Sequence, residues 1–144
     1  MIKSGEEKDV LVLAELAVQM WESHSIGELA EEMAELMAGE DAQFFIKYEQ
    51  ELPVGFAQCQ LRHDYVEGTE SSPVGYLEGI FVRADYRRRG YARELLRECE
   101  KWAREKGCRE FASDCELVNE DSRRFHMAMG FCEANRIICF TKEL

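Results

Sequence analysis

The chain has 144 residues, 46% of them apolar and 33% charged, a composition that favours one globular domain with its own core. Its 29 acidic and 18 basic residues give a formal net charge of −11, which disfavours a nucleic-acid partner because such proteins need a basic face. No apolar run is long enough for a membrane helix and the acidic N-terminus lacks an apolar signal core, so we expect a cytoplasmic protein without a membrane partner.

Two helices followed by three strands are predicted in the N-terminal half. Apolar residues recur at helical spacing in residues 8–21 and 28–37, and Gly39 after the second segment is a typical helix stop. The strand-like segments that follow lie at residues 43–48, 54–62 and 74–82. The polar, glycine-bearing stretch DYVEGTESSP between the last two strands predicts a loop.

A helix, a short strand and another helix are predicted in the C-terminal half. Residues 90–106 carry the strongest helical repeat, residues 109–113 form a short strand, and a helix at 119–129 ends at a glycine. The apolar stretch at 131–142 predicts a final strand or strand pair. The strand–helix–strand order predicts one parallel strand pair in an otherwise antiparallel sheet.

None of the six cysteines forms a C-x-x-C pair, which argues against a zinc or redox motif and predicts no metal site. Several fall on apolar-periodic positions. We therefore interpret them as reduced, small core residues of a cytosolic protein. They are Cys59, Cys99, Cys108, Cys115, Cys132 and Cys139.

The stretch YRRRGYARELL, residues 86–96, places three arginines and a glycine at the start of the strongest helix. The first turn of a helix leaves N–H groups without partners, and the aligned peptide dipoles add partial positive charge there. Gly90 lets a phosphate approach the backbone, Ala92 keeps the next position small, and the arginines add charge at the rim. The turn therefore predicts an anion-binding site, with a solvated basic turn as the alternative.

The same turn resembles the cofactor loop of the GNAT acetyltransferase superfamily, whose pattern is Q/R-x-x-G-x-G/A. The matching residues are Arg87, Arg88, Arg89, Gly90, Tyr91 and Ala92. A second match, Asn119 with Gly130-Phe131, lies on the helix after the next strand. The strings RHDYVEG, SSPVGYLEGIFV and KGCREFASD, together with Trp21 and His24, are similar to bacterial aminoglycoside 6′-N-acetyltransferases. The likeness spans nearly the whole chain and is weakest in the N-terminal third.

This resemblance implies a single GNAT domain over residues 1–144 with a three-layer α+β fold. Its centre would be a twisted, mostly antiparallel sheet with one splayed parallel strand pair, flanked by helices. The cosubstrate would be acetyl-coenzyme A, with its pyrophosphate in the arginine and glycine loop and its pantetheine arm against Asn119. The pantetheine amides would pair with the strand backbone past Gly79, at Ile80, Phe81 and Val82.

Two carboxylates lie near the expected splay. Gly79 within the strand LEGIFV indicates a bulge or a close backbone approach, although a glycine is also tolerated in a bent strand. Glu78 is costly in an apolar strand unless it is paired, so it either pairs with an arginine or the backbone, or lines a cleft. Asp114 ends the next strand and is either a cap or turn residue or faces the same cleft. The resemblance places both carboxylates at the amine substrate.

Amide formation needs a neutral amine, so the enzyme must bind an ammonium and remove one proton. Glu78 and Asp114 would do both, directly or through water, and a free N–H near Ile80 would stabilise the oxyanion. His126 stands where many superfamily members carry a tyrosine acid, so it would protonate the leaving thiolate, or else be a packing or surface residue. No serine or cysteine has a recognisable base partner, which favours direct transfer.

The acceptor site would have aromatic walls. Trp21 and Tyr65 are the candidates because aromatic rings give rigid apolar contact with a polar tip, although each could be an ordinary half-buried aromatic. His24 joins them as a substrate-site residue through the resemblance alone.

The reading we favour is transfer of an acetyl group from acetyl-coenzyme A to the 6′-amine of an aminoglycoside, an antibiotic-resistance activity. The substrate is a polycation, which an acidic cleft attracts. The alternatives are another small amine, a polyamine or a protein N-terminus as acceptor, and a non-catalytic domain that binds a coenzyme A ligand or a partner protein. The apolar segment RIICF is hazardous as an exposed edge strand, so we predict a homodimer with this strand at or near its interface.

Overall fold

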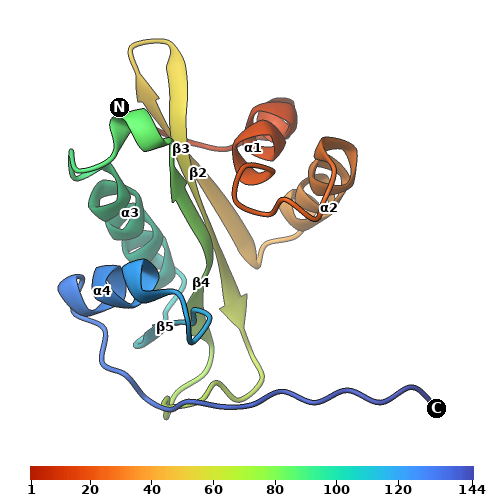
Figure 1. Cartoon of the computed structure of the whole chain (residues 1–144), viewed down its shortest axis with the longest axis vertical. Coiled ribbons are helices and arrows are strands. Elements are labelled where there is room, and N and C mark those ends of the chain that lie inside the picture. The colour runs from red at the N-terminus through yellow and green to blue at the C-terminus, as the bar shows by residue number, and fades with distance from the viewer.

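The computed structural model describes all 144 residues and builds them around a five-stranded mixed sheet (Figure 1). The strands follow one another in the order β1-β2-β3-β4-β5, all antiparallel except for the parallel pair β4 and β5. This sheet confirms the predicted α+β class with one parallel pair. The strands are β1 (Ile2–Ser4), β2 (Ala42–Glu49), β3 (Leu52–Arg62), β4 (Val74–Val82) and β5 (Phe111–Ser113).

Helices cover both faces of this sheet, so the molecule has three layers (Figure 1). One face carries α1 and α2, and the other carries α3 and α4. The α-helices are α1 (Val10–Ala17), α2 (Ile26–Ala38), α3 (Tyr91–Glu105) and α4 (Glu120–Ala128), and 3₁₀ turns occur at η1 (Glu7–Asp9) and η2 (Ala84–Tyr86). None of them has the length and apolarity that a membrane crossing requires.

Two apolar clusters hold the layers together, one on each face of the sheet. Successive side chains of a strand point to opposite faces, so Phe44, Ile46 and Phe56 join the cluster under α1 and α2. Phe45 and Ala57 join the cluster under α3 for the same reason. The α3 stripe in that second cluster consists of Leu95, Leu96, Cys99, Trp102 and Ala103.

The N-terminal helices differ from the sequence prediction at their ends. The helix predicted at 8–21 is helical only from Val10 to Ala17, with η1 before it, and Trp21 comes directly after a turn at residues 18–20. The second helix begins earlier than predicted, because the Ser25 side chain accepts a hydrogen bond of 3.1 Å from the Glu28 N–H and caps the first turn. The short strand β1 has no counterpart in the prediction.

The predicted strand over residues 131–142 is absent, so this prediction is wrong for the single chain. The segment runs out from the body of the molecule as an extended tail (Figure 1), with Ile137, Ile138 and Phe140 exposed at 71%, 81% and 87%. An apolar, strand-like sequence forms a β-strand only when a second strand pairs with it. Within this chain the tail has no such partner, and β5 at the edge of the sheet pairs with β4 alone.

The cysteine interpretation holds for half of the residues. Cys59, Cys99 and Cys108 are buried, as expected of small core side chains. Cys115, Cys132 and Cys139 are exposed, which corrects the prediction, because they lie in the loop after β5 and in the tail.

Candidate active site

The parallel strands β4 and β5 part after three paired positions. Their pairing runs from Gly75 with Phe111 to Leu77 with Ser113, and β5 ends there. At the same height the register between β3 and β4 shifts, so that β4 has one extra residue, Glu78. This shift confirms the predicted bulge, and it leaves the edge of β4 beyond Leu77 without a neighbouring strand.

Backbone groups of β4 face this open edge. The N–H of Arg83 donates to the Val54 carbonyl of β3 at 2.8 Å, and the groups of successive residues alternate between the two edges of a strand. Ile80 and Val82 therefore present theirs away from β3, and the Val82 carbonyl accepts a bond of 2.8 Å from Arg87 Nε. The backbone of Phe81 faces β3, so only two of the three predicted cofactor contacts are turned to the open edge.

The turn before α3 presents a row of unpaired N–H groups. Arg88 and Gly90 have positive φ values of 64° and 80°, and no hydrogen bond within the protein uses the N–H groups from Arg88 to Arg93. Such a turn at a helix N-terminus forms a concave anion site. A Cβ on Gly90 would meet nothing within 4 Å, so glycine is required there by the left-handed backbone and not by space.

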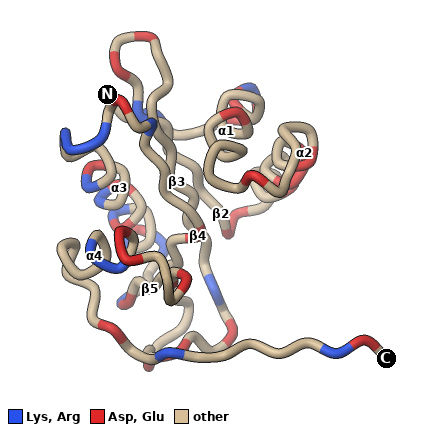
Figure 2. The backbone as a smooth tube through the Cα atoms, viewed as in Figure 1, with Lys and Arg blue, Asp and Glu red and all other residues tan.

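The arginines of this turn adjoin the row of N–H groups along the chain, and Figure 2 shows a stretch of basic residues just before the start of α3. All three are exposed. Arg87 is tied to the Val82 carbonyl, and Arg89 contacts the Asp85 carbonyl at 3.5 Å and stacks 5.0 Å from the Tyr86 ring centroid. Arg88 has no such contact.

The two residues after Gly90 contribute differently from each other. The Tyr91 hydroxyl donates to Glu49 on β2, and its ring lies 4.3 Å from Lys47 Nζ, so this side chain is turned toward the β2–β3 hairpin. Only the backbone N–H of Tyr91 is directed as an anion site requires. Ala92 packs against the α3 cluster.

Glu78 is paired with an arginine. The guanidinium of Arg62 donates to both carboxylate oxygens, with Nε at 3.1 Å and Nη2 at 2.8 Å, and it lies 3.4 Å from the centroid of the Tyr76 ring. The hydrogen bond to Glu78 raises the pKa of Arg62. Of the alternatives open from the sequence, the paired one describes Glu78 in this structure.

Asp114 is linked to the same group through Tyr76. The buried Tyr76 hydroxyl donates to the exposed Asp114 carboxylate. Burial, and then Asp114, raise the pKa of Tyr76 above its ordinary value, so the hydroxyl remains a donor at neutral pH. Glu78, Arg62, Tyr76 and Asp114 thus form one connected chain across the divergence of β4 and β5, which we name the carboxylate network.

Trp21 lies directly over the bulge. A Cβ on Gly79 would stand 2.7 Å from Trp21 Cζ2 and 3.1 Å from the methyl group of Met20. The Trp21 ring also meets Phe56 edge-on, with centroids 6.0 Å apart. The glycine in β4 therefore makes room for an aromatic wall beside Glu78, in addition to its place next to the bulge.

The other two predicted acceptor-site residues are less closely tied to the network. His24 is exposed and lies 3.7 Å from Glu28 Oε2 at the start of α2. Tyr65 is 76% exposed on the loop between β3 and β4. Glu110 anchors that loop by accepting hydrogen bonds from the Glu70 N–H at 2.9 Å and from Ser71 Oγ.

His126 and Asn119 lie on the α3/α4 side of β5. Asn119 caps α4, with its side-chain oxygen accepting from the Ser122 N–H at 3.1 Å. His126 Nε2 lies 2.7 Å from Ser113 Oγ, and His126 Nδ1 lies 2.7 Å from the Ser122 carbonyl. Contrary to the expectation from the sequence, one serine, Ser113, therefore does have a histidine partner.

Three residues of this region escape a reading of the sequence as a site: Arg62, Tyr76 and Ser113. Tyr76 and Glu78 stand two apart in a predicted strand, which is a usable signal because such residues share a face until a bulge intervenes. Arg62 and Ser113 carry no local signal, because their partners lie 16 and 13 residues away along the chain.

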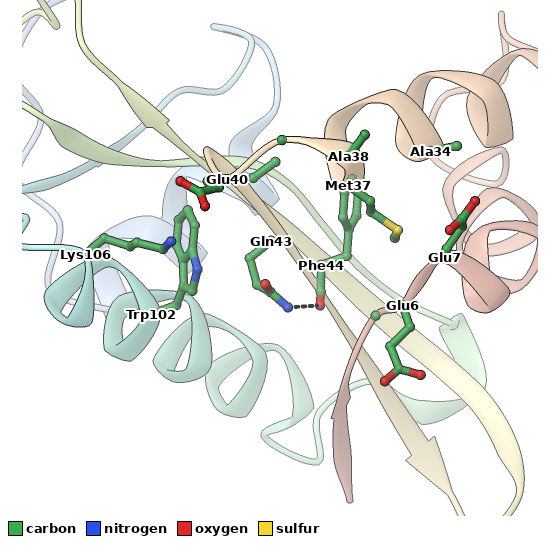
Figure 3. A pocket seen from close by; sticks show the side chains of 13 residues that line it. Glu6, Glu7, Ala34, Met37, Ala38, Glu40, Gln43, Phe44, Trp102 and Lys106 are labelled. Atoms are coloured by element: carbon green, nitrogen blue, oxygen red, sulfur yellow. Dashed lines mark hydrogen bonds between the residues drawn. The ribbon is translucent and has the colours of Figure 1, made fainter.

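A cavity of about 380 Å³ lies elsewhere, between α2, α3 and the segment after β1 (Figure 3). Its lining includes Phe44, Trp102, Glu40 and Lys106, and none of the carboxylate network. Figure 3 shows Trp102 on the α3 side of this cavity and Met37 with Ala38 on the α2 side. It is separate from the divergence of β4 and β5.

Comparison with known proteins agrees with this geometry. Residues 11–131 match the model of a family described as the Acetyltransferase (GNAT) family. Among curated relatives, the aminoglycoside N(6′)-acetyltransferase type 1 of Serratia marcescens is 40% identical over 90% of this chain and 89% of its own. The enzyme of the same name from Acinetobacter haemolyticus is 36% identical over 99% of this chain and 98% of its own.

Solved structures resemble the whole chain. AAC(6′)-Iy in complex with the bisubstrate analogue CoA-S-monomethyl-acetylneamine superposes with a TM-score of 0.95 at 35% identity, over 100% of this chain and 98% of that one. The apo aminoglycoside 6′-N-acetyltransferase AAC(6′)-IG from Acinetobacter haemolyticus gives a TM-score of 0.94 at 37% identity, over 100% and 99%.

Proposed function

The chain belongs to the GNAT acetyltransferase family and is an acetyl-coenzyme A-dependent N-acetyltransferase, and we propose that it acetylates the 6′-amino group of aminoglycosides. The observation that supports this proposal most directly is the pair of carboxylates, Glu78 and Asp114, on either side of the divergence of β4 and β5. The curated relatives that are 36% and 40% identical to this chain are named for the same reaction.

The chain offers complementary groups for acetyl-coenzyme A along one path. The unpaired N–H groups from Arg88 to Arg93, with exposed arginines around them, fit a diphosphate. The backbone groups of Ile80 and the N–H of Val82 on the open edge of β4 fit the amides of a pantetheine arm, while Arg87 already bonds to the Val82 carbonyl. These two features lie at opposite ends of the segment 80–90, so one extended molecule can use both.

The amine is the polar half of the reaction, and the carboxylate network is suited to it. An ammonium group attracted to Glu78 has to share that carboxylate with Arg62, whereas Asp114 is exposed and carries only the Tyr76 hydroxyl. We therefore propose that Asp114 binds the ammonium and accepts its proton. Glu78 would bind a second amine of the substrate or hold Arg62 in position. The net charge of −11 adds a general attraction for a polycation.

Direct attack of the neutral amine on the thioester is the chemistry that this arrangement serves best. The N–H of Ile80 faces the open edge of β4, where it can donate to the oxyanion that develops at the thioester carbonyl. Trp21 packs against Gly79 on the α1/α2 side of the sheet and supplies a rigid apolar wall. Such a wall can position an amino sugar, and its indole does not accept the amine proton.

A panel of amines, assayed by release of the free coenzyme A thiol, tests the proposal. We expect robust turnover of a 6′-amino aminoglycoside and none of its 6′-hydroxyl counterpart. Turnover of simple polyamines or peptide N-termini, without turnover of the aminoglycoside, would assign the enzyme to one of those acceptors. Calorimetric binding of coenzyme A without turnover of any amine would favour a non-catalytic module.

We further propose that two copies assemble through the C-terminal tail. The exposed apolar residues Ile137, Ile138 and Phe140 fit a strand that pairs with the free edge of β5 in a second copy, because a lone apolar strand at that position leaves its backbone unpaired. The six free cysteines suit assembly in the reducing cytoplasm.

Light scattering of the purified protein tests this assembly. We expect a dimer at micromolar concentration, and a shift toward monomer for Ile138→Glu. Thr141→Glu, on the same tail, adds the same charge without removing an apolar side chain and serves as the control. A monomeric wild-type protein would refute the proposal.

A further inference from the structure

The imidazole of His126 is held in one tautomer. Its Nδ1 lies 2.7 Å from the backbone carbonyl of Ser122, and a carbonyl can only accept, so Nδ1 carries the hydrogen. In the neutral ring, Nε2 is then an acceptor, and the Ser113 hydroxyl 2.7 Å away donates to it. The rings of Phe125 and Phe131, with centroids at 5.7 Å and 5.1 Å, fix the plane of the imidazole.

Ser113 stands where the two parallel strands part. It is the last residue of β5 and the last one paired with β4, opposite Leu77. Phe111, two residues earlier on β5, packs with the α3 cluster, so Ser113 shares the α3/α4 face of the sheet. Asp114 follows at once, so the hydroxyl and the carboxylate lie side by side along the chain at the mouth of the divergence.

We propose that Ser113 is the proton donor to the leaving thiolate, with His126 as the positioning residue that replenishes it. This inference rests on the proposed acetyl transfer. As the tetrahedral intermediate collapses, the carbon–sulfur bond breaks and the sulfur takes the proton of the Ser113 hydroxyl. The serine oxygen takes the Nε2 proton of the imidazolium form of His126. The ring returns to the neutral tautomer with hydrogen on Nδ1, which is the form that the Ser122 carbonyl already holds.

The Ser113–His126 pair would replace the tyrosine acid that many superfamily members carry at the helix position of His126. A thiolate whose thiol has an ordinary pKa near 8.5 leaves more readily when it is protonated, and the relay delivers that proton through the Ser113 hydroxyl at the end of β5. After each transfer, Nε2 of the neutral ring is free to take up another proton from solvent, which reloads the donor.

The charged groups on the elements around His126 do not pair with its ring. Arg123 and Arg124 on α4 bond to Glu133 and Asp121, while Asp114 accepts from Tyr76. Glu110, before β5, accepts from Ser71. On α3, the charged side chains beside α4 line a hollow shared with Ala128 and Met129, and they are Arg93, Arg97 and Glu100. The proton supply to Ser113 therefore depends on the imidazole alone.

Single-turnover rates of acetyl transfer to a 6′-amino aminoglycoside, measured from pH 5.5 to 9, test the relay. We expect Ser113→Ala to lower the rate constant about 10²-fold with unchanged affinity for acetyl-coenzyme A, and Ser113→Thr, which keeps a hydroxyl, to restore most of it. His126→Gln should change the pH profile of the rate constant, because Nε2 no longer supplies a proton to Ser113. Thermal unfolding of each variant monitors the fold.

The outcomes separate the relay from the proposed function. Wild-type transfer with an unchanged rate and pH profile in Ser113→Ala overturns the relay and leaves the acetyltransferase intact. A loss in Ser113→Ala that Ser113→Thr does not restore shows a packing role and also overturns it. A wild-type protein that acetylates no amine refutes the proposed function, and the relay with it.

Discussion

The two edges of β4 are built for different purposes. On one side β4 pairs with β3 at eight positions, and the ladder resumes after the bulge at Glu78. On the other side it pairs with β5 at only three positions, and everything beyond Leu77 is open. The closed edge adjoins the buried core residues Phe56 and Ala57, whereas the open edge adjoins Ser113 and Asp114.

This difference teaches where the fold tolerates unsatisfied backbone. Buried N–H and C=O groups need partners, and the β3 edge supplies them within the chain. The open edge keeps the backbone groups of Ile80 and the N–H of Val82 available for a partner from outside, whereas the Val82 carbonyl is held by Arg87. The N–H groups of the Gly90 turn continue that row. Changes at the closed edge should therefore cost stability, and changes at the open edge should cost turnover.

Replacing the two carboxylates of the open edge should give the largest effect of all the changes, and this effect should be on turnover. We expect Glu78→Gln and Asp114→Asn to lower kcat/KM by about 10²–10⁴-fold, because each removes a charge while keeping the size of the side chain. Steady-state assays with a 6′-amino aminoglycoside measure this. Glu116→Gln, an exposed residue on the same loop as Asp114, is the control. Unchanged turnover in both variants would remove the site assignment.

The closed edge is broken by Phe56→Ala. The side chain is fully buried, so we expect the free energy of unfolding to fall by about 3–5 kcal/mol, from lost burial and from the cavity left behind. Urea denaturation measures it. Leu52→Ala, at the exposed end of the same strand, should stay within about 0.5 kcal/mol. A loss below about 1 kcal/mol for Phe56→Ala would show that this core can collapse around the gap.

The turn that continues the open edge is tested by Gly90→Val. A branched side chain at a φ of 80° is strained by about 1–2 kcal/mol, and it obstructs the row of N–H groups. We expect about tenfold weaker binding of acetyl-coenzyme A by calorimetry. Gly107→Val, at a φ of 90° with equally open space after α3, should lose similar stability and keep full affinity. Equal affinities in the two variants would contradict the cradle.

The substitution Tyr76→Phe tests the hydrogen bond that joins β4 to Asp114. Asp114 would lose one hydroxyl donor, so we expect kcat/KM to fall by a few-fold to about tenfold, equivalent to about 0.5–1.5 kcal/mol. Because burial and Asp114 raise the pKa of Tyr76, this loss should be the same from pH 7 to pH 9. Tyr48→Phe is the matched control. A loss that grows as the pH rises would indicate that the tyrosine itself transfers a proton.

The smallest effect is expected at β1, remote from both edges of β4. Burial raises the pKa of Asp9, but hydrogen bonds from the Glu6 N–H and from Lys3 lower it, and together with the nearby lysine charges they outweigh the effect of burial. The pKa of Asp9 therefore lies below its usual value. The stabilisation is therefore present above the ordinary carboxyl pKa and is lost as pH falls through the lowered value.

Lys3→Met should remove part of this stabilisation. We expect a small fall in the unfolding temperature at pH 7, because Lys3 is partly exposed, and a smaller fall at pH 3. Thermal unfolding at the two pH values measures it, with unchanged turnover. A greater loss at acid pH would reverse the sign of the argument.

The sequence by itself determined the elements whose signals are local. The helical repeat from Tyr91 to Glu105, the basic turn with Gly90 before it and the strand around Glu78 are encoded in spacings of one to four residues. The parallel strand pair is predicted from the order of these elements.

Only the tertiary structure decided what those residues touch. Glu78 pairs with Arg62, Asp114 with Tyr76 and Ser113 with His126, across separations of 13 to 38 residues that no local pattern encodes. The tail shows the same limit, because its apolar pattern specifies a strand but not the partner strand that a ladder requires. Local spacing fixes backbone preference, whereas pairing depends on which distant groups the packed sheet brings together.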